Sequence, residues 1–207
     1  MNTPPRDHID SLALLRTLYA PAKGRAVQKQ LDALDPHCRA FIGLSPFLVL
    51  STSNLAHQLD ASPRGGAPGF VKIDAQGDLL IPDAPGNNRL DSLENIMATG
   101  QAGLLFMIPG FDETLRVNGC ATLSLAEADL QACTDERRRP KLVIRIAVQA
   151  AYLHCAKAFM RSRLWQADAQ VARASLPSIG QMIADQTGIA GQPESQQQMQ
   201  QRYAPDL

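Results

Sequence analysis

The sequence predicts a mainly β fold with helices, of the α+β class, in which an antiparallel β-barrel carries N-terminal and C-terminal helical additions. Six short segments rich in apolar and β-branched residues are typical of strands, and turn sequences separate several of them. These segments are residues 46–53, 69–73, 78–81, 102–108, 113–123 and 142–152. Neither GxGxxG nor GxxxxGK(S/T) occurs, which disfavours a Rossmann site or a P-loop. The succession therefore favours a small closed barrel over a doubly wound parallel sheet.

Three helices are expected before the barrel. Asp10 is positioned to cap a first helix, and its apolar residues recur at helical spacing at Leu12, Leu14, Leu15 and Leu18. A second helix fits residues 25–34. A third begins at residue 36 or 37 and ends at residue 44, with Asp35 as its cap and a proline in its first turn.

Four further helices are expected, over residues 90–99, 126–132, 157–163 and 178–187. The chain then divides into an N-terminal helical segment (1–44), the barrel domain (45–165), and a C-terminal helix with a polar tail (166–207). The tail from Gly188 contains a glutamine run and is low in complexity, so we expect it to dock loosely or to lack structure.

The composition disfavours several classes of protein. The 207 residues have a formal net charge of zero, whereas general nucleic-acid binders and proteins of anionic membranes need a basic surface. The four cysteines form neither a CxxC pair nor a zinc-finger spacing, so we expect reduced thiols and no metal site. The N-terminus lacks a signal-peptide pattern, and no apolar run reaches the roughly 18 residues that span a bilayer. We expect a cytoplasmic protein without nucleic-acid or membrane partners.

Residues 81–93, with the sequence IPDAPGNNRLDSL, give the strongest indication of a binding site. A strand end leads through a Pro/Gly turn into a helix start, where unpaired backbone N–H groups favour an anion. Arg89 adds a planar set of donors for a phosphate or carboxylate, and Asn87, Asn88 and Ser92 add neutral donors. The alternative is an ordinary helix start, with Asn88 as its N-cap and Arg89 in solvent.

A second motif is DASPRGG at residues 60–66. It offers the hydroxyl of Ser62, the guanidinium of Arg64 and glycines that allow a ligand to approach the backbone closely. The alternative is a glycine-rich loop with a surface arginine. His154, at the end of an apolar strand, is a candidate acid or base, although a hydrogen-bonded structural histidine is the simpler interpretation.

The order of three sequences, SPRG, PGNNRLDS and ETLRVNG, resembles the pyridoxamine 5′-phosphate oxidase-like flavoproteins, the FMN-binding split β-barrels. The resemblance covers about residues 40–165. It implies a six-stranded antiparallel split β-barrel that forms a homodimer with two FMN sites at its interface. It also implies that Asn88, Arg89 and Ser92 hold the phosphate of FMN.

The resemblance implies further cofactor-binding positions. The backbone of the strand before the phosphate turn lies beside the flavin ring in this family, which points to Ile81, Pro82 and Asp83. An arginine-bearing strand upstream matches Ser62 and Arg64 through an insertion. The positions expected to act across the dimer are Thr114, which reaches toward the flavin, and Lys157, Arg161 and Trp165, from the C-terminal segment that closes the partner's site.

Two departures from the family pattern bear on activity. The true oxidases carry an arginine/lysine pair at the phosphate turn, whereas Arg89 is followed by Leu90. The arginine–histidine motif that binds the vitamin's phosphate has no counterpart near the C-terminus. Oxidation of pyridoxamine 5′-phosphate is therefore disfavoured.

The leading interpretation is an FMN-dependent oxidoreductase that transfers electrons between a nicotinamide or other donor and a small molecule or oxygen. A second interpretation is a flavin carrier or redox sensor without turnover of its own. A third is a haem-handling split-barrel protein, in which His154 or another histidine contacts the haem. The sequence assigns no catalytic residue.

Overall fold

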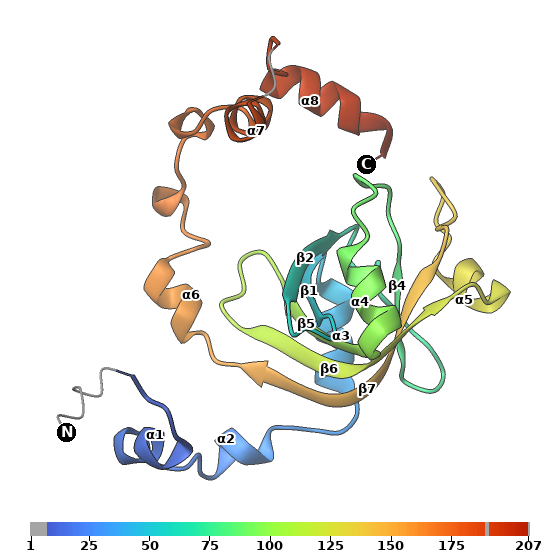
Figure 1. The fold of residues 1–207 in the computed structure, drawn as a ribbon. Coiled ribbons are helices and arrows are strands. Elements are labelled where there is room, and N and C mark those ends of the chain that lie inside the picture. Colours follow the sequence, from blue (N-terminus) through green and yellow to red (C-terminus); the bar gives the residue numbers. More distant parts are fainter. Residues whose placement is uncertain (1–7, 189–190, 207) are drawn as a thin grey trace.

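The computed structural model describes residues 8–188 and 191–206, and Figure 1 shows their arrangement. Its centre is a curled sheet of seven antiparallel strands in the order β2-β1-β5-β6-β7-β4-β3. The strands are β1 (Phe47–Ser53), β2 (Leu59–Gly65), β3 (Lys72–Ile73), β4 (Leu79–Pro82), β5 (Gln101–Met107), β6 (Thr114–Ser124) and β7 (Val143–His154). The predictions that concern residues 1–7, 189–190 and 207 lie outside the described residues.

The sheet confirms the α+β class and the antiparallel split barrel, with one strand more than the six expected. The closed barrel that the strand pattern favoured is wrong. Within the described residues, β2 and β3 are the two ends of the sheet and neither pairs with a further strand on its outer side. The sheet therefore curls through its twist without closing through hydrogen bonds.

Strand β2 is the strand that the pattern of apolar residues does not predict, although the resemblance implies an arginine-bearing strand there. It pairs with β1 over seven positions, from Phe47 opposite Gly65 to Ser53 opposite Leu59. Gly66 N–H donates to Pro46 O at 3.0 Å. Because alternate residues of a strand face the same neighbour, the missing N–H of Pro63 faces the free edge, where proline is tolerated.

One face of the sheet holds the main hydrophobic core. Alternate residues of the strands point into it, as a period of two requires. Fully buried examples from five strands are Leu48, Leu50, Ile81, Leu104, Phe106, Leu115, Val117, Ile144 and Ile146. Helix α4 (Asp91–Thr99) packs against β1 and β6 and adds Leu93 and Ile96 to this core. Helix α3 (Pro36–Leu44) adds Cys38 and Ile42.

The helices largely follow the predictions. The remaining ones are α1 (Leu12–Leu18), α2 (Arg25–Gln28), α5 (Glu127–Ala132), α6 (Lys157–Ser162), α7 (Ile179–Thr187) and α8 (Gln196–Tyr203), with short 3-10 turns at η1 (Ala167–Ala169), η2 (Arg173–Ser175) and η3 (Ala204–Asp206). Asp35 caps α3 as predicted, through Cys38 N–H at 2.7 Å. No helix among residues 8–188 and 191–206 is both long and apolar enough to cross a membrane.

Two local predictions about helices are wrong, and for the C-terminal tail the alternative of a segment without structure is wrong. The cap of α1 is Ser11 rather than Asp10, because its hydroxyl accepts from Leu14 N–H. Helix α2 ends at Gln28 instead of continuing to residue 34, because Leu31 exchanges two backbone hydrogen bonds with Ala151 of β7. The glutamine-rich tail forms α8, which a reciprocal capping box between Ser195 and Gln198 stabilises at its start.

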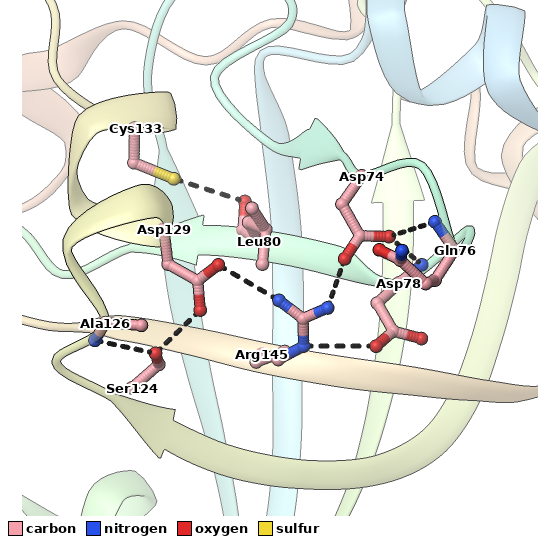
Figure 2. A network of polar contacts seen from close by, with 9 residues as sticks. All are labelled: Asp74, Gln76, Asp78, Leu80, Ser124, Ala126, Asp129, Cys133 and Arg145. Atoms are coloured by element: carbon pink, nitrogen blue, oxygen red, sulfur yellow. Dashed lines mark hydrogen bonds and ion pairs between the residues drawn. The ribbon is translucent and has the colours of Figure 1, made fainter.

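Arg145 of β7 ties together three parts of the chain on the side of the sheet that carries α5 (Figure 2). Its guanidinium pairs with Asp74, with Asp78 at 3.1 Å and with Asp129 at 3.0 Å. Asp74 also accepts the backbone N–H groups of Gln76 and Asp78, both at 2.9 Å, which shapes the turn between β3 and β4. This network fixes the turn and α5 against β7.

Candidate functional site

Strand β2 presents polar side chains on the face that continues the hydrophobic core. Its residues alternate between exposed and half-buried, and the half-buried ones are Asp60, Ser62 and Arg64. They lie beside Thr52, Leu50 and Leu48, which are the buried residues of β1. An inward-facing Asp-Ser-Arg row at a sheet edge has no apolar surface to bury, so it suits a ligand site.

The start of α4 has no side-chain cap. Leu90 is the N-cap residue and makes no capping hydrogen bond. The alternative in which Asn88 caps this helix is wrong, because Asn88 lies in the preceding turn with φ of 58° and Leu90 is the N-cap residue. Instead, Asn87 Oδ1 accepts Arg89 N–H at 3.0 Å and closes that turn. The first backbone N–H groups of α4 are therefore left without a side-chain partner, as a helix-terminal anion site requires.

The two motifs meet in one open pocket between β2 and the start of α4. Its lining residues are Asp60, Ser62, Asn87, Arg89, Asp91 and Ser92. The structure thus brings together Ser62, Arg89 and Ser92, which the sequence analysis drew from separate segments. Asp60 and Asp91 also line the pocket and were not among the predicted residues, although both stand inside the two quoted motifs.

Carboxylates partly neutralise both arginines of the site. Arg64 donates to Ser62 Oγ, and to Pro63 O at 2.9 Å. Burial lowers the pKa of Arg64, and the negative charges of Asp83 and Asp60 offset part of this effect. Arg89 pairs with Asp91 at 2.5 Å, which raises the pKa of Arg89, and the charge of Asp60 acts in the same direction. The guanidinium of Arg89 lies in solvent, with its side chain 77% exposed.

A polar stripe fixes α4 on the two strands beneath it. Ser92 Oγ donates to Asp60 of β2, Asn95 Nδ2 donates to Thr52 Oγ1 of β1 at 3.0 Å, and Thr99 Oγ1 donates to Ser53 O at 3.2 Å. The three helix positions recur at the spacing of one helix face. The stripe sets the position of the α4 start relative to β2 and so defines the pocket.

The backbone beyond β3 is open at the end of β4. Within the described residues, β3 pairs only with Leu79 and Leu80, so Ile81 and Pro82 have no strand neighbour on that side. The side chain of Ile81 is fully buried in the core. Asp83 N–H donates to Leu142 O at 3.0 Å, which continues the pairing with β7. Because alternate residues of a strand face the same neighbour, the N–H and C=O of Ile81 face β7, and it is the backbone of Pro82 that faces the open side. The contact expected between this backbone and a flavin stays a prediction.

The four positions expected to act across a dimer lie elsewhere on the chain. Thr114 is buried at the start of β6, opposite His154. Lys157 and Arg161 lie on α6, which stands outside the barrel in Figure 1. Trp165 donates its indole N–H to Phe111 O at 2.7 Å and anchors the segment after α6 to its own chain. Their expected role at the partner's site stays a prediction.

A second group of polar and charged side chains surrounds Tyr152 on β7. Arg116 donates to the Tyr152 hydroxyl at 2.9 Å, and Lys29 lies over the ring at 5.4 Å from its centroid. The His154 ring lies 5.0 Å from the same centroid, and the buried His154 Nε2 has no hydrogen-bond partner among the residues that the structure describes. Burial, with the nearby charges of Arg116 and Lys29, lowers the pKa of His154. The sequence analysis favoured a hydrogen-bonded structural role for His154, and the Nε2 atom does not fit that interpretation.

Comparison with known proteins gives one family. A family model described as pyridoxamine 5′-phosphate oxidase matches residues 34–155, which include all seven strands. No curated protein matches the chain.

Among solved structures, similar ones include HupZ of Group A Streptococcus, at 15% identity over 57% of this chain and 91% of that chain, with a TM-score of 0.46. General Stress Protein 26 from Bacillus anthracis has 13% identity over 56% of this chain and 88% of that chain, with a TM-score of 0.43. The conserved hypothetical protein Rv2991 from Mycobacterium tuberculosis has 13% identity over 70% of this chain and 97% of that chain, with a TM-score of 0.45.

Proposed function

This chain belongs to the pyridoxamine 5′-phosphate oxidase family, and from that membership we propose that it binds FMN and acts as an FMN-dependent oxidoreductase on a small molecule. The observation that carries the proposal is the pocket between β2 and α4, which gathers Ser62, Arg89 and Ser92 from separate segments. FMN, when bound, accepts a hydride or electrons at its N5 atom, while the protein binds, orients and shields it.

The chemistry of the pocket fits a phosphate monoester. The uncapped start of α4 supplies backbone donors, and the Ser62 hydroxyl, which accepts from Arg64, keeps its own proton to donate to a ligand. The Arg89 side chain is exposed and pairs with Asp91 at the start of α4. Its guanidinium can therefore reorient and donate hydrogen bonds to phosphate oxygens. In this proposal Asn88 contributes through the turn that positions Arg89.

The flavin ring has a place beside the end of β4. Within the described residues, no strand pairs with residues 81–83 on the β3 side, where the backbone of Pro82 faces outward, and we propose that a planar ring lies along this edge. The charge of Asp83 acts on Arg64, which links this backbone to the phosphate end of the site. We propose that the domain spanning residues 45–165 builds this site in each subunit.

We propose a homodimer in which the C-terminal segment of each subunit closes the partner's site through Lys157, Arg161 and Trp165, with Thr114 reaching toward the flavin. Large apolar side chains lie exposed on α1 and from α6 to η2, which favours a protein partner over solvent. They are Leu12, Leu18, Tyr19, Met160, Leu164, Val171 and Leu176.

Oxidation of pyridoxamine 5′-phosphate itself is not the proposed reaction. Leu90, half exposed at the N-cap of α4, stands where the true oxidases place a second phosphate-binding cation. A flavin carrier or redox sensor would use the same pocket, and slow reduction that does not saturate with any donor would identify it. A haem-handling protein is less well supported, because His154 Nε2 is buried against the protein.

An absorption spectrum of the freshly purified protein tests the proposal first. Flavin bands are expected, and chromatography of the chromophore that heat releases should give FMN rather than FAD or riboflavin. A colourless protein that also fails to bind added FMN contradicts the proposal. A Soret band that appears with haemin and disappears in His154→Ala supports the haem alternative instead.

Light scattering tests the interface separately. A dimer is expected at micromolar concentration, and its FMN content should be one per subunit. A monomer that retains FMN contradicts a site completed by the partner's C-terminal segment, while leaving the pocket between β2 and α4 in place.

A further inference from the structure

Asp60 joins strand β2 to the start of α4 within the pocket. It is the first inward residue of β2, followed by Ser62 and Arg64 on the same face. Its Oδ2 accepts the hydroxyl proton of Ser92, a buried residue in the first turn of α4. A serine hydroxyl has a single proton to donate. Ser92 therefore cannot donate to a phosphate while it donates to Asp60.

The charge of Asp60 also acts on Arg89, which lines the pocket, and on Arg64, which lies farther along β2. Asp91 is different, because it pairs with Arg89 alone among the site's cations. Asp60 thus holds the hydroxyl of Ser92 and adds a negative charge to the pocket that Arg89 also lines.

We propose that Asp60 is a specificity-determining carboxylate that competes with the phosphate of the ligand for the Ser92 hydroxyl and places a like charge beside it, and so lowers the affinity of the site for phosphate-bearing flavins. The inference rests on the proposed FMN site. A phosphate that enters must release Ser92 from Asp60 and then lies close to a carboxylate of the same sign, which is unfavourable. The flavin should therefore be exchangeable rather than permanently retained.

A purely structural role for Asp60 makes a different prediction. Asn95 and Thr99 already fix α4 on β1, so the Ser92 contact is one of three in the polar stripe. If Asp60 only positions α4, its replacement by asparagine keeps an acceptor for Ser92 and leaves ligand affinity unchanged. If Asp60 competes with phosphate, removal of its charge strengthens the binding of FMN and not of riboflavin, which lacks the phosphate.

The experiment measures dissociation constants for FMN and riboflavin by flavin fluorescence, with apoprotein of the wild type, Asp60→Asn and Glu94→Gln. Glu94→Gln is the matched control, because it removes one negative charge from the exposed face of α4, the helix whose start borders the pocket. In Asp60→Asn the affinity for FMN should rise about tenfold while that for riboflavin stays the same. Glu94→Gln should change neither. Thermal unfolding of each apoprotein reports whether the fold is kept.

The outcomes separate the two proposals. A wild type that binds no FMN contradicts the proposed function. A wild type that binds FMN, with an unchanged or reduced ratio of FMN to riboflavin affinity in Asp60→Asn, overturns the role of Asp60 alone. If Asp60→Asn does not fold, Asp60→Ser keeps a hydroxyl acceptor for Ser92 without the charge, and the same rise in the ratio is expected.

Discussion

Replacement of Arg145 by methionine should destabilise the protein far more than replacement of a surface arginine. The change keeps the length of the side chain and removes the charge that holds Asp74, Asp78 and Asp129 together. The three carboxylates are 15%, 24% and 11% exposed, so they would face one another with little water. Breaking a buried ion pair costs about 3–5 kcal/mol. Because Arg145 is 28% exposed, we expect the lower end, about 3 kcal/mol.

The pH dependence gives this prediction a sign. Burial of Asp74 favours its neutral form, but the N–H groups of Asp78 and Gln76 and the charge of Arg145 outweigh burial and lower its pKa. Its stabilising contribution is therefore present above the pKa of the unfolded chain and is lost as the pH falls through the folded pKa. Without Arg145 the three carboxylates take up protons at higher pH. The difference in unfolding free energy between the variant and the wild type should therefore shrink as the pH falls from 7 to 4.

Urea unfolding at pH 7 and at pH 4.5 measures both effects. Arg139→Met is the matched control, because Arg139 pairs with Glu127 beside the same helix while 44% and 74% of the two side chains are exposed. The control should lose about 0.5 kcal/mol of unfolding free energy. In a separate thermal unfolding experiment, Arg145→Met should lower the melting temperature by about 6–12 °C. Equal losses in the two variants, or a deficit in Arg145→Met that grows toward pH 4.5, would refute the reasoning.

Three further predictions concern the site and the sheet. Arg89→Ala should weaken FMN binding by about 1.5–3 kcal/mol without destabilising the apoprotein; unaltered affinity in a flavin titration removes Arg89 from the site. Gly119→Ala should lower the unfolding free energy by at least about 2 kcal/mol, because the new Cβ would lie 2.2 Å from the backbone oxygen of Ala147. Gly103→Ala should lower it less, because there the new Cβ would lie 3.2 Å from the Oδ1 atom of the movable Asn118 side chain. His154 should titrate below its ordinary pKa in an NMR titration, and a midpoint at or above 6.5 contradicts its burial beside two cations.

The sequence allows most of the sheet to be predicted, because its buried strands carry their own apolar pattern. The segment at residues 46–53 is an example: Leu48 and Leu50 alternate toward the core, and β1 forms there. Strand β2 has no such pattern, since its inward residues are polar. Its seven-position pairing with β1 specifies the strand, and long-range pairing is not visible in a local window.

Three donors of the candidate pocket, Ser62, Arg89 and Ser92, could be predicted from the sequence, whereas Arg64 and Asn88 do not line it and its carboxylates were not predicted. A guanidinium after a Pro/Gly turn indicates anion binding by its residue type alone, and Arg89 does line the pocket. Asp60 and Asp91 indicate nothing by type, because aspartate is common in turns and at helix starts. Their significance comes from distance: one pairs with Arg89, and the other accepts from Ser92, 32 positions along the chain. The cap assigned to Asn88 failed for a similar reason, since the turn it occupies depends on Asn87.

The edge position of β2 explains why the polar residues can be there at all. A central strand with Asp60, Ser62 and Arg64 on its core face would bury them between two neighbours, at a cost that one hydrogen bond does not offset. At the edge, β1 pairs one side of the strand, while the other side and the end near α4 stay open to water and to a ligand. The same openness lets Pro63 stand in the strand, since its missing N–H faces outward. The split in the barrel is thus what permits an inward-facing row of polar and charged residues within a small β fold.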